Sequence, residues 1–178
     1  EFLVSNEMKL ACLTDDDPAD LTMTRGYLAF YERFHSDPAM LDSAAFYLLS
    51  TTSKAIDEKV HLGYLLEDYN SISGIAMDLD TSEISDPWTA YRIGEAYGQM
   101  GQQGNSIEFF QRACSLMPLN LRFLDKLGIA LYQGKKEDQA LIVFNQLVEL
   151  NPFVSKHWYN LGYYYLMNSD HQKAKYYL

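Results

Sequence analysis

The C-terminal half of the sequence repeats itself every 34 residues, and no other feature restricts the fold as strongly. Glycine recurs at this spacing, with an apolar residue directly before it and a large hydrophobic residue three positions after it. The glycines are Gly94, Gly128 and Gly162, and two prolines, Pro118 and Pro152, recur with the same spacing. So many positions in phase indicate repeated structural units that stack on one another.

The units span residues 87–120, 121–154 and 155–178, and each is predicted to form two amphipathic helices joined by a short polar turn. In the second unit, apolar side chains recur at helical spacing in two runs that begin at Leu124 and Ala140. Proline ends the second helix of a unit because it cannot continue the hydrogen-bond ladder. One such hairpin cannot bury its own apolar face, so the units must pack against each other.

The three repeated glycines lie in the middle of a predicted helix, where glycine costs about 1 kcal/mol relative to alanine. A cost repeated in every unit indicates that two helices approach each other too closely to leave room for a Cβ atom. We therefore predict close helix contacts at Gly94, Gly128 and Gly162.

This period and this order of small and large residues resemble those of the tetratricopeptide repeat (TPR) family. The resemblance covers about half of the chain, residues 87–178. It implies an all-α fold, a right-handed α-solenoid of stacked antiparallel helix pairs. It also implies a non-catalytic protein–protein interaction module that binds a peptide or partner protein in its concave groove.

The first half of the chain is less regular, and we expect residues 1–86 to form a degenerate helical, TPR-like region that continues the solenoid. Residues 53–86 fit a degenerate repeat. Asp37-Pro38 and Asp86-Pro87 read as helix starts, with Asp as the cap and Pro at the first helical position. The predicted helices span about 5–13, 20–35, 39–52, 55–66 and 69–80.

The net charge of −10 argues against nonspecific binding to nucleic acid or to anionic membranes. The charge is uneven, because residues 1–86 hold 5 basic and 17 acidic residues whereas residues 87–178 hold 9 and 7. No stretch approaches the roughly 18 consecutive apolar residues of a membrane-spanning helix, and the N-terminus has no signal-peptide pattern. A soluble chain is expected, and the cytoplasm is favoured over the periplasm.

Residue patterns for catalysis or metal binding are incomplete throughout the sequence. Asp78 and Asp80 match the first ligand positions of a calcium-binding loop. However, Glu83 stands where the turn of such a loop needs Gly, and Thr89 stands where a Glu would bind the ion through both oxygens. The four histidines and two cysteines show no metal-ligand spacing, and no phosphate-binding loop or nucleophile motif occurs. We therefore predict no enzyme active site, no metal and no cofactor.

The TPR resemblance also implies which side chains line the groove, because the first helix of each unit faces it. Aromatic walls with Arg and Lys suit an extended peptide that carries acidic groups or a free C-terminus. Alternatively, the aromatic rings pack between units and the basic residues only balance charge; the sequence leaves both interpretations open. The groove residues are Trp88, Tyr91, Arg92, Arg122, Lys126, Tyr132, Lys156, Tyr159, Asn160 and Tyr163.

Two further functions stay open from the sequence. The third unit stops inside its second helix without a polar cap, so we consider a structural spacer or a homo-oligomer formed through the open C-terminal end. The third alternative is the regulatory segment of an enzyme whose catalytic domain lies outside this chain. The identity of the partner is not encoded in any short motif.

Overall fold

The computed structural model describes residues 19–34, 37–50 and 55–178. They divide into two compact units, an N-terminal unit (Glu1–Asp78) and a C-terminal unit (Leu79–Leu178). Within the described ranges the regular structure is entirely helical, which confirms the all-α prediction. The helix expected at 5–13 lies outside these ranges.

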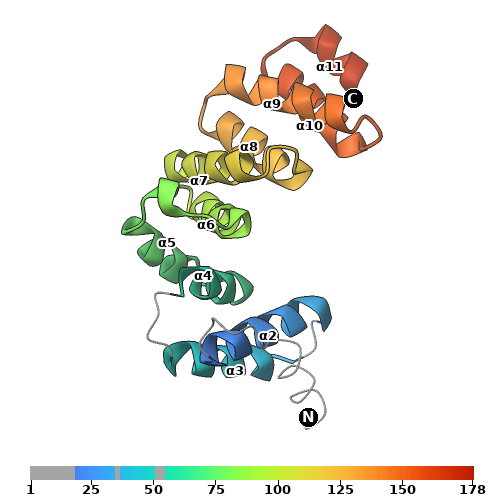
Figure 1. The fold of residues 1–178 in the computed structure, drawn as a ribbon. Helices are drawn as coiled ribbons and strands as arrows, with labels where there is room; N and C mark the ends of the chain where they lie inside the picture. The colour runs from blue at the N-terminus through green and yellow to red at the C-terminus, as the bar shows by residue number, and fades with distance from the viewer. Residues whose placement is uncertain (1–18, 35–36, 51–54) are drawn as a thin grey trace. The chain divides into compact units, whose positions relative to one another are not determined.

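The described part of the N-terminal unit confirms the helices expected between residues 20 and 80, to within three residues at each end. The helices are α2 (Ala19–Phe34), α3 (Ala39–Ser50), α4 (Ile56–Leu65) and α5 (Tyr69–Met77), shown in Figure 1. As expected, the Asp37 carboxylate starts α3, because its Oδ1 accepts a hydrogen bond from the backbone N–H of Ala39 at 2.9 Å. Buried side chains from three helices form the core of this unit: Leu28, Leu41, Ala44, Leu48 and Leu62.

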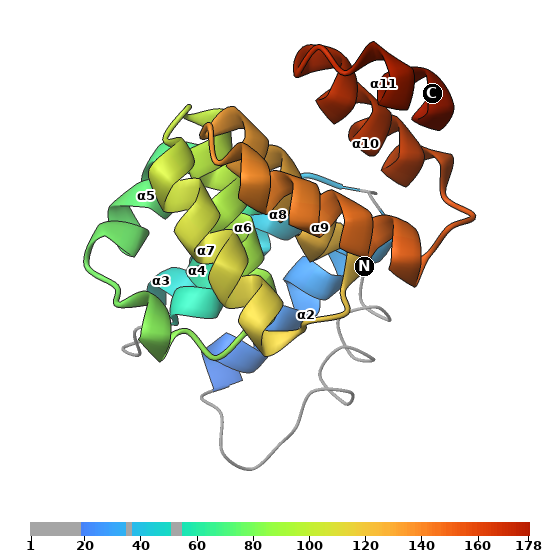
Figure 2. The same cartoon turned by 90° about the horizontal axis from the view of Figure 1, so that it is seen from above.

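The C-terminal unit is a series of antiparallel helix pairs stacked in chain order (Figures 1 and 2). A short 3-10 helix, η1 (Thr81–Glu83), precedes the first pair. The pairs are α6 (Pro87–Gln99) with α7 (Gln103–Leu116), α8 (Leu121–Gln133) with α9 (Glu137–Leu150), and α10 (Ser155–Met167) with α11 (His171–Tyr177). Among the described helices, none combines the length and apolar character that a membrane crossing requires.

The segment before α6 is fixed at both ends. Pro87 is the first residue of α6, and Oδ2 of Asp86 accepts a hydrogen bond from the backbone N–H of Thr89 at 2.7 Å, as expected for a helix start. Arg112 on α7 donates hydrogen bonds to the backbone carbonyls of Ser82 and Ile84 at 2.9 and 2.6 Å. These bonds attach η1 and the following residues to the first helix pair.

The turn inside each helix pair has the same backbone conformation. One residue per turn has a positive φ angle, in the left-handed region: Glu67 (56°), Gly101 (73°), Lys135 (59°) and Ser169 (62°), each 34 residues from the next. The following residue donates its N–H to the carbonyl five positions earlier, at 2.8–2.9 Å in all four turns. The turn between α4 and α5 therefore follows the same 34-residue period as the three turns of the C-terminal unit.

Replacing Lys135 with glycine should stabilise the C-terminal unit by about 0.5–1 kcal/mol. A side chain in the left-handed region is strained by roughly 1–2 kcal/mol, partly offset by the greater chain entropy of glycine in the unfolded state. Urea unfolding followed by tryptophan fluorescence measures this, because both tryptophans, Trp88 and Trp158, lie in this unit. Lys136→Gly is the control, since Lys136 has a φ of −97° and should not gain stability.

The repeated glycines lie where the two helices of a pair touch. A Cβ atom on Gly94 would lie 2.8 Å from Cδ1 of Phe110, and one on Gly128 would lie 2.7 Å from Cε1 of Phe144. At Gly162 the obstacle is Leu178, whose Cγ would be 2.7 Å away. The predicted close helix contacts are thus confirmed at Gly94 and Gly128, and at Gly162 the close contact is with the residue that follows α11.

Candidate functional site

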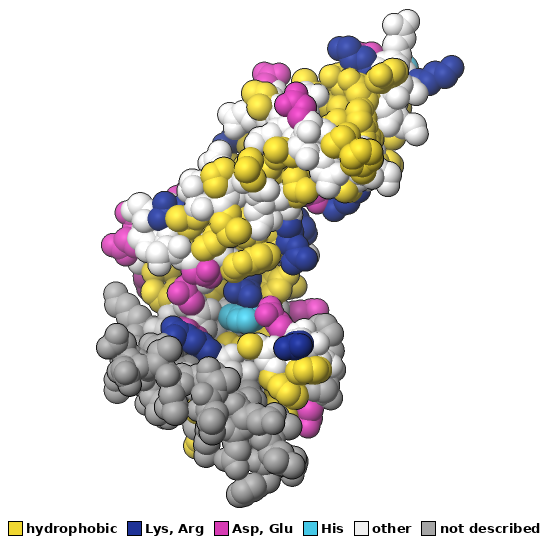
Figure 3. Space-filling model, turned by 45° about the vertical axis from the view of Figure 1, so that its right-hand side comes forward, with side chains coloured by type: hydrophobic (Ala, Val, Ile, Leu, Met, Phe, Trp, Pro, Cys, Tyr) yellow, Lys and Arg dark blue, Asp and Glu magenta, His cyan; other side chains and the backbone are white. Residues whose placement is uncertain are grey.

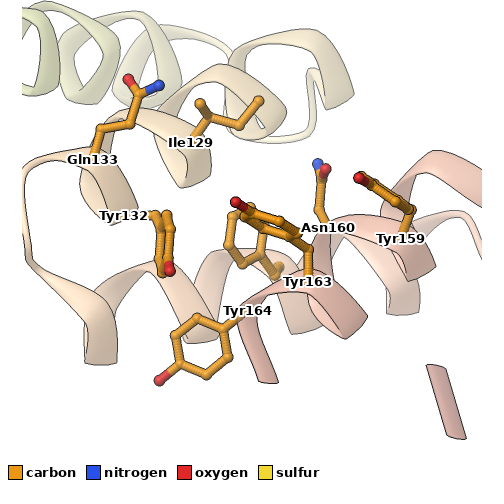
Figure 4. A pocket seen from close by; sticks show the side chains of 8 residues that line it. Ile129, Tyr132, Gln133, Tyr159, Asn160, Tyr163 and Tyr164 are labelled. Carbon is orange, nitrogen blue, oxygen red and sulfur yellow. The ribbon is translucent and has the colours of Figure 1, made fainter. Parts of the chain in front are cut away.

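The first helices of the three pairs, α6, α8 and α10, contribute to one face of the C-terminal unit, which we call the groove face. Two hollows lie one repeat apart along it, and a third, of about 540 Å³, lies between α10 and the end of α11 and is lined by Ser155, Lys156, Trp158, Tyr159, Tyr177 and Leu178. The first, of about 310 Å³, is formed by α8, α9 and α10 and is named here the tyrosine pocket (Figure 4). Its lining residues are Ile129, Tyr132, Gln133, Phe144, Tyr159, Asn160, Tyr163 and Tyr164.

A second hollow, of about 190 Å³, occupies the equivalent place one repeat earlier, between α6, α7 and α8. We call it the polar hollow, because Glu95 and Lys126 line it. Gly98 and Ala130 stand in it where the tyrosine pocket has Tyr132 and Tyr164, 34 residues later. The repeat therefore sets the position of both hollows, whereas the individual side chains set their chemistry.

The tyrosine pocket owes its shape to rings from two helices. Tyr159 and Tyr163 are one helical turn apart on α10, and their rings stack with centroids 6.1 Å apart. The ring of Tyr132 on α8 meets Tyr163 edge to face at 6.3 Å, so Tyr163 lies between the other two rings (Figure 4). Tyr159 is 57% exposed and Tyr163 is 40% exposed, so both present ring surface to a ligand. Figure 3 shows hydrophobic side chains gathered over the part of the molecule that α10 and α11 form.

The phenols at the inner wall of the pocket are neutral. Burial raises the pKa of the Tyr132 and Tyr164 hydroxyls above the usual value, and the nearby Glu137 carboxylate acts in the same direction on both. Neither hydroxyl ionises at neutral pH. The tyrosine rings of the inner wall therefore carry no charge.

The two lysines predicted for the groove are bound to carboxylates of the groove face itself. Lys126 Nζ donates to Oε2 of Glu95 at 2.8 Å, which joins α8 to α6. Asp125, which is buried, accepts from Lys156 Nζ at 2.6 Å and from Asn160 Nδ2 at 2.7 Å. Both positive charges are therefore balanced within the face, and Asp125 holds two predicted groove residues of α10 in place.

The remaining predicted residues lie toward the other end of α8. The exposed Arg122 guanidinium lies 5.6 Å from the ring centre of Trp88 and forms no ion pair with any described residue. The ring of Tyr91, only 5% exposed, stacks on Phe123 with centroids 5.1 Å apart and belongs to the core between the helix pairs. Arg92 is half-buried on α6.

The predicted residues therefore fall into separate groups on the groove face. Four of them line the tyrosine pocket: Tyr132, Tyr159, Asn160 and Tyr163. The pocket also contains Gln133, Phe144 and Tyr164, which the sequence did not assign to a site. The signal that could have found them is the repeat itself, because they lie 34 residues after Gln99, Phe110 and Ala130 of the polar hollow.

Outside the groove face, we considered the side chains of the described residues that could bind a metal ion or act as a nucleophile. Within the described ranges, no group of three or more His, Cys, Asp or Glu side chains could hold a metal ion. Asp80, considered as part of a calcium loop, starts η1 by accepting a hydrogen bond from the backbone N–H of Ser82 at 2.9 Å. Burial raises the pKa of the Cys114 thiol to about 11, which disfavours the nucleophilic thiolate at neutral pH.

Stacked hairpins with a 34-residue period define the class of α-helical repeat proteins. Three models of the tetratricopeptide repeat family match residues 89–118, 123–153 and 143–176. The chain belongs to the tetratricopeptide repeat family, with its recognised repeats within residues 89–176. No curated protein sequence matches it significantly.

Solved TPR structures share the fold at low sequence identity. A MamA RS-1 double mutant is 15% identical with a TM-score of 0.71, over 89% of this chain and 90% of that chain. MamA residues 41 to the end from Desulfovibrio magneticus RS-1 is also 15% identical, with a TM-score of 0.68 over the same shares. YrrB, described as a TPR protein with an unusual peptide-binding site, is 17% identical with a TM-score of 0.68, over 98% of this chain and 88% of that chain. At these identities the likeness concerns the fold alone.

Proposed function

We propose that the C-terminal unit is a non-catalytic module that binds an extended peptide segment of a partner protein along the groove face. The observation that carries this proposal is the pair of hollows one repeat apart, of which the tyrosine pocket presents exposed aromatic rings. An extended peptide can place successive side chains in such hollows. YrrB, with its peptide-binding site, shares the fold and is consistent with this function.

The acidic group or free C-terminus expected in the ligand would be recognised at the Trp88 end of the groove face. Arg122 is exposed there, and no described carboxylate pairs with it. Arginine forms two parallel hydrogen bonds with a carboxylate, and the Trp88 ring holds its planar group in place. Lys126 and Lys156 contribute less, because Glu95 and Asp125 already bind them.

Reversing the charge of Arg122 should weaken peptide binding about tenfold or more, since hydrogen bonds to a charged group contribute about 1.5–3 kcal/mol. Peptides are selected from a displayed random library on the whole chain, and their Kd values are then measured by fluorescence anisotropy with the chain and with Arg122→Glu. Arg122 is changed alone, because a carboxylate at position 126 would repel Glu95 and disturb the fold.

Arg33→Glu is the matched control. Arg33 is also exposed and lies 5.3 Å from a ring centre, that of Phe34, but it belongs to the N-terminal unit. Its replacement changes the net charge by the same amount and should leave the Kd unchanged. Equal effects of the two variants, or no selected peptide that depends on Arg122, would contradict the proposal and favour the spacer or oligomerisation role.

A further inference from the structure

We infer that the tyrosine pocket takes an arginine side chain of the bound peptide. This inference rests on the proposed function and names the residue that the groove face selects. Three observations lead to it: the size of the pocket, the aromatic ring faces in it, and a lining without Lys or Arg that has carboxylates nearby.

The pocket fits a long side chain with an apolar stem. Its volume of about 310 Å³ exceeds that of any single side chain, and Ile129 and Phe144 supply apolar surface beside the tyrosine rings. Arginine buries its methylene groups along such surface while its planar charged group lies against an aromatic face. The amides of Gln133 and Asn160 complete the lining.

Aromatic faces in this chain already hold cations at the distance that such binding needs. Arg122 lies 5.6 Å from the ring centre of Trp88, and Lys173 Nζ lies 4.9 Å from that of Tyr165. Both distances are within the roughly 6 Å over which a ring attracts a cation. Tyr159 and Tyr163 present the same kind of ring surface in the pocket, with substantial exposure.

The charges favour a cationic guest over an acidic one. None of the lining residues is Lys or Arg, and Lys156 of the same helix is bound to Asp125. The carboxylates of Glu137 and Asp138, at the start of α9, are exposed; Glu137 raises the pKa of the lining residues Tyr132 and Tyr164, and Asp138 raises that of Tyr164. A neutral aromatic guest would use the rings but none of this charge, whereas an arginine uses both.

The polar hollow offers no such site. Gly98, Ile129 and Ala130 stand there in place of three of the tyrosines, and its two charged residues, Lys126 and Glu95, bind each other. One position of the peptide is therefore selected for arginine. Because Arg122 and Tyr132 are ten residues apart on α8, they lie about 15 Å apart along its axis, which an extended peptide spans with about five residues. The peptide carries its acidic group and its arginine at about that separation.

The test uses a peptide selected on the whole chain whose binding depends on Arg122. Its arginine is replaced in turn by citrulline, which keeps the shape but not the charge, by phenylalanine and by glutamate. Each Kd is measured with the chain, with Tyr163→Phe and with Tyr163→Leu. Tyr163→Phe keeps a ring and Tyr163→Leu removes it, and tryptophan fluorescence melting verifies that both variants fold.

Citrulline should weaken binding to the chain about tenfold, within the range expected for a cation against a ring. Tyr163→Phe should keep the preference for arginine over citrulline, and Tyr163→Leu should abolish it. A double-mutant cycle over these Kd values measures the coupling between the ring and the charge. Selected peptides that depend on Arg122 but carry an apolar, aromatic or acidic residue at this position would overturn the inference while leaving the proposed function intact. Absence of any peptide that depends on Arg122 would overturn both.

Discussion

Replacing Phe123 with alanine is expected to lower the free energy of unfolding of the C-terminal unit by about 3–5 kcal/mol. Phe123 is fully buried, and its ring meets Trp88 at 4.9 Å and Tyr91 at 5.1 Å. It thereby joins α8 to the first helix pair, and its removal leaves a cavity between two repeats that neighbouring rings cannot fill. Urea unfolding followed by tryptophan fluorescence gives the difference directly.

Phe153→Ala is the matched control for this prediction. Phe153 lies in the loop between α9 and α10 and is 95% exposed, so its removal should change the stability by no more than about 0.5 kcal/mol. Similar losses from the two variants would show that the packing of Phe123 between the repeats does not determine the stability of this unit.

Replacing Gly128 with alanine is expected to destabilise the same unit by up to about 2 kcal/mol. The new methyl group would lie 2.7 Å from the buried ring of Phe144 and 3.3 Å from Val143, and overpacking of this kind costs about 1–3 kcal/mol. The gain in helix propensity, about 1 kcal/mol, offsets only part of this cost. Thermal unfolding measured by circular dichroism should show a lower Tm.

Gly104→Ala is the control that distinguishes the cost of steric contact from the gain in helix propensity. Gly104 lies in α7 with no atom within 4 Å of the position that its Cβ would take, so alanine should be neutral or slightly stabilising there. A stabilising Gly128→Ala, or loss of stability in both variants, would mean that contact with Phe144 is not the reason for the repeated glycine.

Those features of the fold that depend on neighbouring residues and recur in every repeat could be predicted from the sequence. The period located the helix pairs, and the mid-helix glycines indicated the close contacts because no other cause explains a repeated loss of helix propensity. The two helix starts predicted from Asp-Pro pairs, at Asp37 and Asp86, were confirmed. The left-handed residue of each turn was missed, because Lys135 and Ser169 carry no signal for that conformation, unlike Gly101.

The groove face was less predictable, because its contacts do not follow the period. The ion pairs Lys126–Glu95 and Lys156–Asp125 join residues 31 apart in the sequence, so they depend on how neighbouring helices are offset in space. The same repeat position holds Tyr91, Asp125 and Tyr159, which are 5%, 7% and 57% exposed. Repeat register therefore indicates the helix face, whereas neighbouring side chains decide how much of a residue a ligand can reach.

The turns described above also bear on how the C-terminal unit folds. Each one closes with a hydrogen bond across five residues, and the helices with the most extensive contacts are consecutive in the chain. No distant segments must meet before packing begins, so the entropy of loop closure is small and the contact order is low. Proteins with such local contacts fold within about microseconds to milliseconds, and folding of this unit can begin at any of its hairpins.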